Sequence, residues 1–265
     1  MCRLYGVTRA GFYAWRSRAP SERARQNAAL ADRIRAVHRA SGGTYGSPRV
    51  YRELRRRGCR ASENRIARVM RALGIRARVA TIRYTNPRLQ QFFGSARNEQ
   101  LDRALTAPDQ VWVGDLTYLK VGTIYRYLAV VMDKYSRRVL GWAYGRRKNV
   151  ALTLRALNRA VRARRPPRGL IFHTDRGIEY AAEAFKVRLA ELGITQSMNR
   201  PGKVTDNAYI ESFFHSMKTD IVHGLRFNQD RDIERAVRTY VPFYNGTRLH
   251  SSLKYVPPAT FERLT

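Results

Sequence analysis

The chain has 265 residues, 44% of them hydrophobic, which is enough for one large domain or two modest ones with a real core. Fifty-one Lys and Arg against 20 Asp and Glu give a formal net charge of +31, typical of proteins that bind nucleic acid. No apolar run approaches the roughly 18 residues of a membrane span, and residues 1–15 lack the apolar segment of a signal peptide. Two cysteines, Cys2 and Cys59, supply neither a disulfide framework nor a CxxC zinc motif. We therefore exclude secreted, membrane-spanning and zinc-finger classes and expect a soluble protein of a reducing compartment.

The first 105 residues carry the denser positive charge, with 24 arginines and no lysine against six acids. Apolar residues at helical spacing predict three helices in this part, at residues 23–40, 47–57 and 62–73. Ser47 is expected to cap the second helix, with Pro48 in its first turn, and Ser62 to cap the third. The four-residue break between the last two helices makes them a helix-turn-helix candidate.

The outer face of the third predicted helix carries Arg65, Arg68 and Arg71, which could reach DNA phosphates or guanine edges. A small helical bundle with solvated arginines fits the same spacing equally well. Residues 76–106 lose periodicity, so we interpret them as a linker that contains one strand. With the boundary near Thr106, the helical region is 1–75 and the second domain is 107–265.

After the linker the pattern changes to strands that alternate apolar and polar residues. Three of these strands follow one another closely, which predicts an antiparallel meander. We predict strands at 111–120, 125–133, 138–144, 169–173 and 195–198, and helices at 150–164, 181–192, 207–222 and 231–244. This order indicates an α/β fold, a mixed sheet of three antiparallel strands plus two more, flanked by helices.

Three acids of the second domain are candidates for a cation site. Asp115 lies in the middle of a predicted strand, Asp175 directly follows another strand, and Glu211 lies on a helix beside an apolar stripe. Hard divalent cations such as Mg²⁺ take carboxylate oxygens as ligands. On composition alone, however, acids paired with nearby arginines such as Arg176 are the simpler interpretation, because this domain has 14 acids.

Three segments of this domain together resemble the DDE transposase and integrase superfamily: VWVGDLTY at 111–118, HTDRGIEY at 173–180 and DNAYIESFFHSMK at 206–218. Thirty-five residues lie between Asp175 and Glu211, the spacing for which those enzymes are named. Further blocks resemble the second-frame product of the IS3 family of bacterial insertion sequences; they lie at 1–15, 44–49, 65–70 and 244–258. The resemblance covers nearly the whole chain.

The resemblance implies a ribonuclease H-like catalytic core behind an N-terminal helix-turn-helix-like DNA-binding domain. By matching positions, Asp115, Asp175 and Glu211 are the catalytic, metal-binding triad. Lys218 matches the basic residue that these enzymes place against substrate DNA. Asn207, one turn before Glu211, is expected on the same helix face and at the DNA.

The activity implied is that of a DDE polynucleotidyl transferase, a transposase that cleaves phosphodiesters at insertion-sequence ends and transfers the freed 3′ hydroxyl into DNA. Two Mg²⁺ ions, for which Mn²⁺ can substitute, would act on the attacking and leaving oxygens, so no covalent protein–DNA intermediate is expected. The chain lacks the His-His-Cys-Cys set that retroviral integrases carry ahead of their core, and we expect no zinc.

The expected partners are double-stranded DNA, as terminal inverted repeats and as target, and further copies of the chain in a dimer or larger assembly. Arg176, Arg200 and Lys203 are the candidate DNA contacts near the acids. A bacterial cytoplasmic, nucleoid-associated location without membrane contact is implied. The alternative is a DNA-binding protein without catalysis; the intact acids and Lys218 favour the enzyme.

Overall fold

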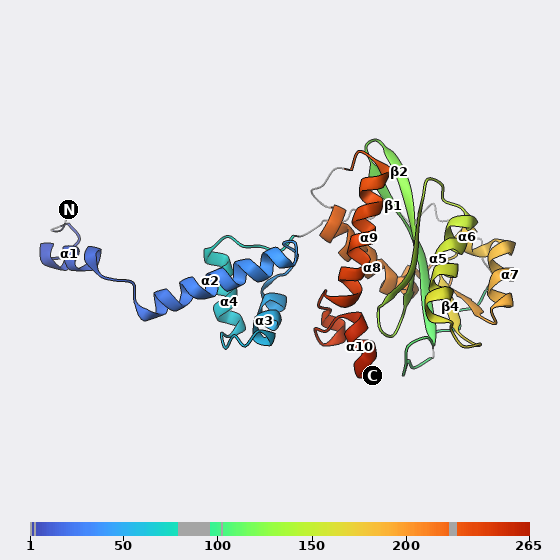
Figure 1. Ribbon diagram of the computed structural model, residues 1–265, viewed down its shortest axis with the longest axis horizontal. Coiled ribbons are helices and arrows are strands. Elements are labelled where there is room, and N and C mark those ends of the chain that lie inside the picture. Colours follow the sequence, from blue (N-terminus) through green and yellow to red (C-terminus); the bar gives the residue numbers. More distant parts are fainter. Residues whose placement is uncertain (1, 3, 79–95, 102, 223–226) are drawn as a thin grey trace. The chain divides into compact units, whose positions relative to one another are not determined.

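The computed structural model describes residues 2, 4–78, 96–101, 103–222 and 227–265. The chain divides into two compact units, 1–77 and 78–265, each with its own core (Figure 1). None of the helices in these described ranges is long and apolar enough to cross a membrane.

The N-terminal unit is helical, with α1 (Arg9–Ser17), α2 (Glu22–Ala40), α3 (Ser47–Arg56) and α4 (Glu63–Ala72). Helices α2 to α4 follow the predicted ranges within a residue or two. They share a core of Leu30, Ile34, Val37, Val50, Leu54, Ile66 and Met70. The Ser62 cap is confirmed, whereas Gly46 and not Ser47 is the N-cap of α3. Helix α1 was not predicted, and it buries no residue.

The second unit is built on one mixed sheet, as the sequence predicts. Its five strands lie in the order β3-β2-β1-β4-β5. β1, β2 and β3 form the antiparallel meander, and β4 and β5 run parallel to β1. The strands are β1 (Val111–Val121), β2 (Ile124–Asp133), β3 (Val139–Gly145), β4 (Ile171–Thr174) and β5 (Thr195–Met198).

Helices cover both faces of the sheet (Figure 1). Successive residues of β1 point to opposite faces, so Trp112 packs with one helical layer and Val113 with the other. The first layer is α5 (Val150–Arg164), α6 (Ile178–Ala181) and α7 (Glu183–Glu191). The second is α8 (Ala208–Met217) and α9 (Asp230–Gly246).

Two helical predictions need correction. The helix predicted at 181–192 is α7, which begins at Glu183 because Ala182 is extended (φ −62°, ψ 139°), and the short helix α6 before it was not predicted. The helix predicted at 207–222 changes type along its length: a 3₁₀ turn at Val204–Asn207 precedes α8, and a π turn at Lys218–Val222 follows it. A last helix, α10 (Pro258–Leu264), was not predicted.

Residues 96–101, the described segment near the end of the predicted linker, have no helix or strand and pack within the second unit. Asn98 and Gln100 donate to the carboxylate and the backbone carbonyl of Asp206, at 2.8 and 2.9 Å. The Met198 N–H at the end of β5 donates to the Arg97 carbonyl. The strand expected within 76–106 falls largely on residues 79–95 and 102, outside the described residues.

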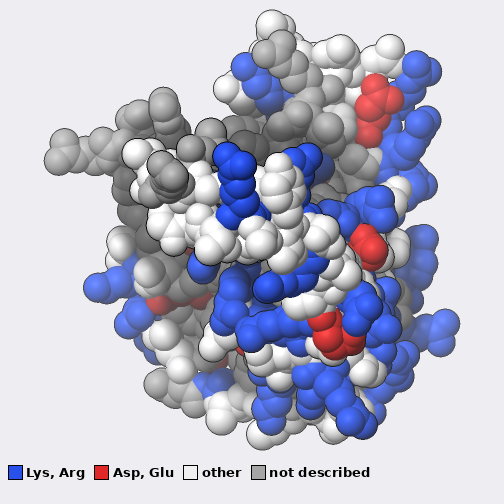
Figure 2. Space-filling model, turned by 90° about the vertical axis from the view of Figure 1, so that its left-hand side faces the viewer, with Lys and Arg blue, Asp and Glu red and all other residues white. Residues whose placement is uncertain are grey.

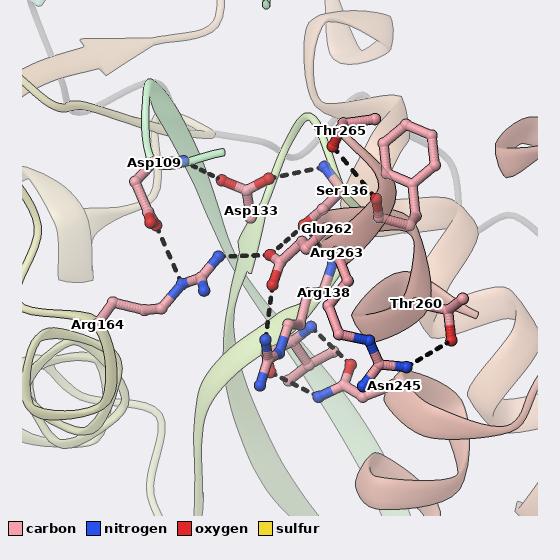
Figure 3. A network of polar contacts seen from close by, with 12 residues as sticks. Asp109, Asp133, Ser136, Arg138, Arg164, Asn245, Thr260, Glu262, Arg263 and Thr265 are labelled. Carbon is pink, nitrogen blue, oxygen red and sulfur yellow. Dashed lines mark hydrogen bonds and ion pairs between the residues drawn. The ribbon is translucent and has the colours of Figure 1, made fainter. Parts of the chain in front are cut away.

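A polar network holds α10 to the place where β1 begins (Figure 3). Its centre is the Glu262 carboxylate, only 7% exposed, which pairs with Arg164 and with Arg138 at 2.6 Å and accepts from the Ser136 hydroxyl at 2.8 Å. Asp133, at the end of β2, accepts from the Asp109 and Ser136 backbone N–H groups. Here each buried carboxylate is neutralised or hydrogen-bonded.

Candidate active site

Asp115 and Asp175 lie at one edge of the sheet because β1 and β4 pair in parallel. The register places Gly114 opposite Thr174, so the next residues, Asp115 and Asp175, meet at the carboxyl end of β4. Gly114 has a steric reason to be glycine, since a Cβ there would lie 2.7 Å from the Phe172 ring. Both aspartates are half-buried.

The turn after β4 fixes the Asp175 carboxylate. The Gly177 backbone N–H donates to Asp175 Oδ1 at 3.0 Å. His173, on β4 two residues before Asp175, is fully buried. Its Nδ1 lies 2.9 Å from Ser197 Oγ and its Nε2 lies 2.8 Å from Asn199 Oδ1. Burial lowers the pKa of His173 to about 4, so the ring is neutral at pH 7. His173 therefore ties β4 to the end of β5 directly before Asp175.

The third acid is carried by α8, which is attached to the same stretch of β1. Asn207, the N-cap residue of α8, donates from Nδ2 to the Gly114 carbonyl at 3.3 Å, next to Asp115. The apolar side of α8 packs into the core through Ile210, and Glu211 is exposed. Asn207 is only 2% exposed, so in this structure it connects α8 to β1 and is not available to DNA as the sequence suggested.

The three acids are electrostatically coupled. Burial raises the pKa of Asp115 well above its ordinary value, and the charges of Asp175 and Glu211 raise it further. Burial also raises the pKa of Asp175, and partial desolvation followed by the charge of Asp175 raises that of Glu211. Among the described residues, no Lys, Arg or His lies within ion-pair distance, 4 Å, of any of the three carboxylates.

These carboxylates have the chemistry of a divalent cation site. Mg²⁺ prefers oxygen ligands, and partly buried carboxylates without a cationic partner are costly unless a cation compensates them. In the part of the chain that the structure describes, no three His, Cys, Asp or Glu side chains converge closely enough to hold a metal ion. The three acids thus lie near one another and have the chemistry of metal ligands, but in this structure their side chains do not converge on one point.

Lys218 lies beside the acids, where the sequence predicted a basic residue. Its Nζ is 4.6 Å from the centre of the Tyr118 ring on β1. Burial lowers the pKa of Lys218, and the charge of Asp115 acts in the opposite direction. Lys218 is the first residue of the π turn that follows α8, and such turns often accompany functional sites.

The other predicted DNA contacts near the acids differ in availability. The Arg176 guanidinium donates to the Asn199 and Ala96 carbonyls, at 2.6 and 3.2 Å, and so faces into the unit. Arg200 pairs with Asp206 at 2.9 Å and lowers the pKa of that carboxyl to about 2. Lys203 is exposed.

Sequence reasoning missed two residues of this site. Glu179, in the first turn of α6, is only 5% exposed, and its Oε2 lies 3.4 Å from the Lys148 ammonium. Glu179 follows Asp175 by four residues in the same turn and short helix, and this closeness in sequence is a signal that was available. Lys148 gave no such signal, because its contact depends on the loop between β3 and α5 reaching α6.

The N-terminal unit offers exposed arginines on α4. Arg68 and Arg71 are exposed, as expected for residues that contact DNA. Arg65 instead donates to Asn27 at 2.9 Å and to Gln26 at 3.5 Å on α2, so it braces the unit. On the face of the molecule in Figure 2, Lys and Arg far outnumber Asp and Glu.

Models of known protein families match segments of both units, and known proteins are similar to nearly the whole chain. An HTH-like domain model matches residues 25–83, and two integrase core domain models match residues 106–204 and 192–258. The chain is 36% identical to an insertion element IS600 31 kDa protein of Shigella sonnei, over 98% of this chain and 97% of that protein. It is 35% identical to the transposase InsF for insertion sequence IS3A of Escherichia coli, over 99% of this chain and 92% of that protein.

A solved structure shares the fold. The chain is similar to a chain of the simian T-cell lymphotropic virus intasome, solved with the PP2A regulatory subunit B56 gamma. The TM-score is 0.52 at 17% identity, covering 86% of this chain and 74% of that one. The ribonuclease H-like integrase fold expected from the sequence is therefore confirmed.

Proposed function

Because the chain belongs to the IS3 family of insertion-sequence transposases, and is therefore a DDE polynucleotidyl transferase, we propose that Asp115, Asp175 and Glu211 form its catalytic centre. This centre would hold two Mg²⁺ ions, replaceable by Mn²⁺. It would cut the ends of the element and join the freed 3′ hydroxyl to a second phosphodiester. The observation that carries the assignment is the strand register that brings Asp115 and Asp175 together, with α8 tied to the same place by Asn207.

The chain's own residues would bind and orient the reacting groups. Bound divalent ions supply charge cancellation on the phosphate and activation of the attacking oxygen. Carboxylates from β1, from the turn after β4 and from α8 would hold these ions, and the Lys218 ammonium would offset phosphate charge beside them. Because the attacking oxygen belongs to water or to the DNA 3′ end, no covalent protein–DNA intermediate forms.

The DNA partner is double-stranded, first as the terminal inverted repeats and then as the target. Of the predicted DNA contacts among the described residues, Arg68 and Arg71 on α4, Lys203 and the ion-paired Arg200 are exposed. Symmetric processing of two element ends favours a dimer or larger assembly on DNA, at the nucleoid of the bacterial cell.

A strand-transfer assay tests this function. A pre-cut oligonucleotide from the DNA flanking the element's own reading frame is mixed with a plasmid target in Mg²⁺, with the wild type or Glu211→Gln. The wild type is expected to give joined product, and the variant to give none while still binding the oligonucleotide. Loss of DNA binding together with activity would instead assign Glu211 a structural role.

The absence of a covalent intermediate has its own test. Reactions are stopped in denaturant during cleavage and strand transfer, and DNA-linked protein is sought on a gel. No adduct is expected. A tyrosine- or serine-linked adduct would contradict the proposed chemistry while leaving the DNA substrate assignment intact.

A further inference from the structure

The Glu179 carboxylate is a fourth acid at the edge where Asp115 and Asp175 meet. A Cβ built on Gly177 would lie 3.0 Å from Asp175 Oδ1 and 3.2 Å from Glu179 Oε2, so both oxygens face the same small space beside Gly177. Glu179 Oε2 is buried and accepts no hydrogen bond from the described residues. A buried carboxylate oxygen in this situation requires a cation close by.

Lys148 forms an ion pair with this carboxylate. Its ammonium is 3.4 Å from Glu179 Oε2, and the Lys148 side chain is 48% exposed whereas that of Glu179 is 5% exposed. Because Glu179 Oε2 and Asp175 Oδ1 face the same space beside Gly177, the Lys148 ammonium lies on the Glu179 side of the Asp175 carboxylate. Glu179 is thus the ion-pair partner that positions Lys148 beside the acids.

We propose that Lys148, held by Glu179, is the built-in counter-cation of the catalytic acids, and that divalent ions entering the centre must overcome its charge. This inference rests on the proposed function, since it needs Asp115 and Asp175 to be metal ligands. A unit positive charge near a divalent cation weakens its binding. The Lys148 side chain is half-exposed, whereas that of its partner Glu179 is buried.

The pair is therefore expected to set the affinity of the centre for divalent ions. Mn²⁺ binding to the full-length chain without DNA is measured by electron paramagnetic resonance at constant ionic strength. Lys148→Met is expected to bind Mn²⁺ about tenfold more tightly than the wild type. In a Glu179→Gln background the same substitution is expected to change the affinity less than about threefold, because Lys148 is no longer held near the acids.

Lys186→Met is the matched control. Lys186 is 47% exposed, about as much as Lys148, and lies 3.7 Å from the α7 residue Glu183, whose side chain is 80% exposed. The Lys186→Met variant lowers the net charge of the protein by one, as Lys148→Met does. Its Mn²⁺ affinity is nevertheless expected to stay within about twofold of the wild type.

The outcomes separate this inference from the proposed function. If Asp175→Asn leaves Mn²⁺ binding unchanged, the metal assignment itself fails. If Asp175→Asn removes binding but Lys148→Met binds no more tightly than the wild type, only the inference about Lys148 is overturned. Equal effects of Lys148→Met and Lys186→Met would also overturn it, since they would show a general effect of net charge.

Discussion

The second unit contains two groups of carboxylates in contrasting situations. Where β1 begins, Glu262 is surrounded by Arg164, Arg138 and the Ser136 hydroxyl (Figure 3). Beside the middle of the same strand, Asp115 and Asp175 have no ion-pair partner among the described residues, in a chain with a net charge of +31. The contrast is between a buried carboxylate that arginines neutralise directly and two carboxylates that no described Lys, Arg or His approaches within 4 Å.

The largest expected difference between the two groups is in activity. Asp115→Asn, Asp175→Asn and Glu211→Gln should each reduce strand transfer by at least about 10³-fold, because each removes a proposed metal ligand. Glu262→Gln should leave the activity of the folded protein within a few-fold of the wild type. Initial rates of strand transfer at equal concentrations of folded protein check this, and a comparable loss from Glu262→Gln would erase the distinction.

The free energy of unfolding should depend on the buried ion pairs that hold the fold. Arg248 and Asp220 form an ion pair at 2.6 Å, with side chains only 6% and 4% exposed, and the Tyr240 hydroxyl donates to the same carboxylate. Arg248→Met should lower the free energy of unfolding by about 3–5 kcal/mol, because it leaves a buried charge unpaired.

The control for this prediction is an exposed pair. Arg25 and Glu22 are 67% and 68% exposed at 2.8 Å. Arg25→Met should change the free energy of unfolding by less than about 0.5 kcal/mol in denaturant titrations. Equal effects of the two substitutions would show that burial does not distinguish these ion pairs.

A substitution of Asn207 tests whether the proposed catalytic acids depend on how α8 is positioned. Asn207→Ala breaks the bond to the Gly114 carbonyl and should lower the rate of strand transfer by about 10–100-fold with little change in DNA affinity. A DNA contact would behave differently: affinity would fall, and so would its dependence on salt. Measuring both the rate and the binding isotherm decides between the two roles.

The dependence of stability on pH should have opposite signs at the two kinds of acid. In chelating buffer, the raised pKa of Asp115 means that its charged form destabilises the fold. Asp115→Asn should therefore gain stability over the wild type as pH rises above the ordinary value of 3.8 and through the raised pKa. For Asp206, whose pKa Arg200 lowers to about 2, the loss caused by Asp206→Asn should be full above pH 4 and shrink below it. If the stability of both variants relative to the wild type changed in the same direction as pH rises, the contrast would be contradicted.

The smallest expected effects lie in the N-terminal unit. Arg68→Ala and Arg71→Ala should each weaken DNA binding a few-fold and reduce the slope of log affinity against log salt by about one. Arg65→Ala, which removes bonds to α2, should lower the stability of the unit instead. An unchanged salt slope in both exposed variants would place the DNA on another surface.

The sequence predicted the frame of the site well because strand periodicity and chain order decide which residues meet at a sheet edge. Asp115 in one strand and Asp175 directly after another could be placed from those patterns. The orientation of Arg65 and the burial of Asn207 could not, since each depends on how a helix is rotated once its core has packed. Helix α1 was missed because it buries no residue and so has no core face, and α10 was missed because it has only seven residues. The Lys148–Glu179 pair depends on a loop conformation that no periodicity encodes.

The most direct test of the account is the location of divalent ions in a crystal grown with a pre-cut element end and Mn²⁺. Anomalous scattering should reveal two ions about 3.5–4 Å apart, bound by Asp115, Asp175 and Glu211, and none at Glu262. Ions bound elsewhere, or DNA bound with no ion at these three acids, would contradict the claim that Asp115, Asp175 and Glu211 form the catalytic centre.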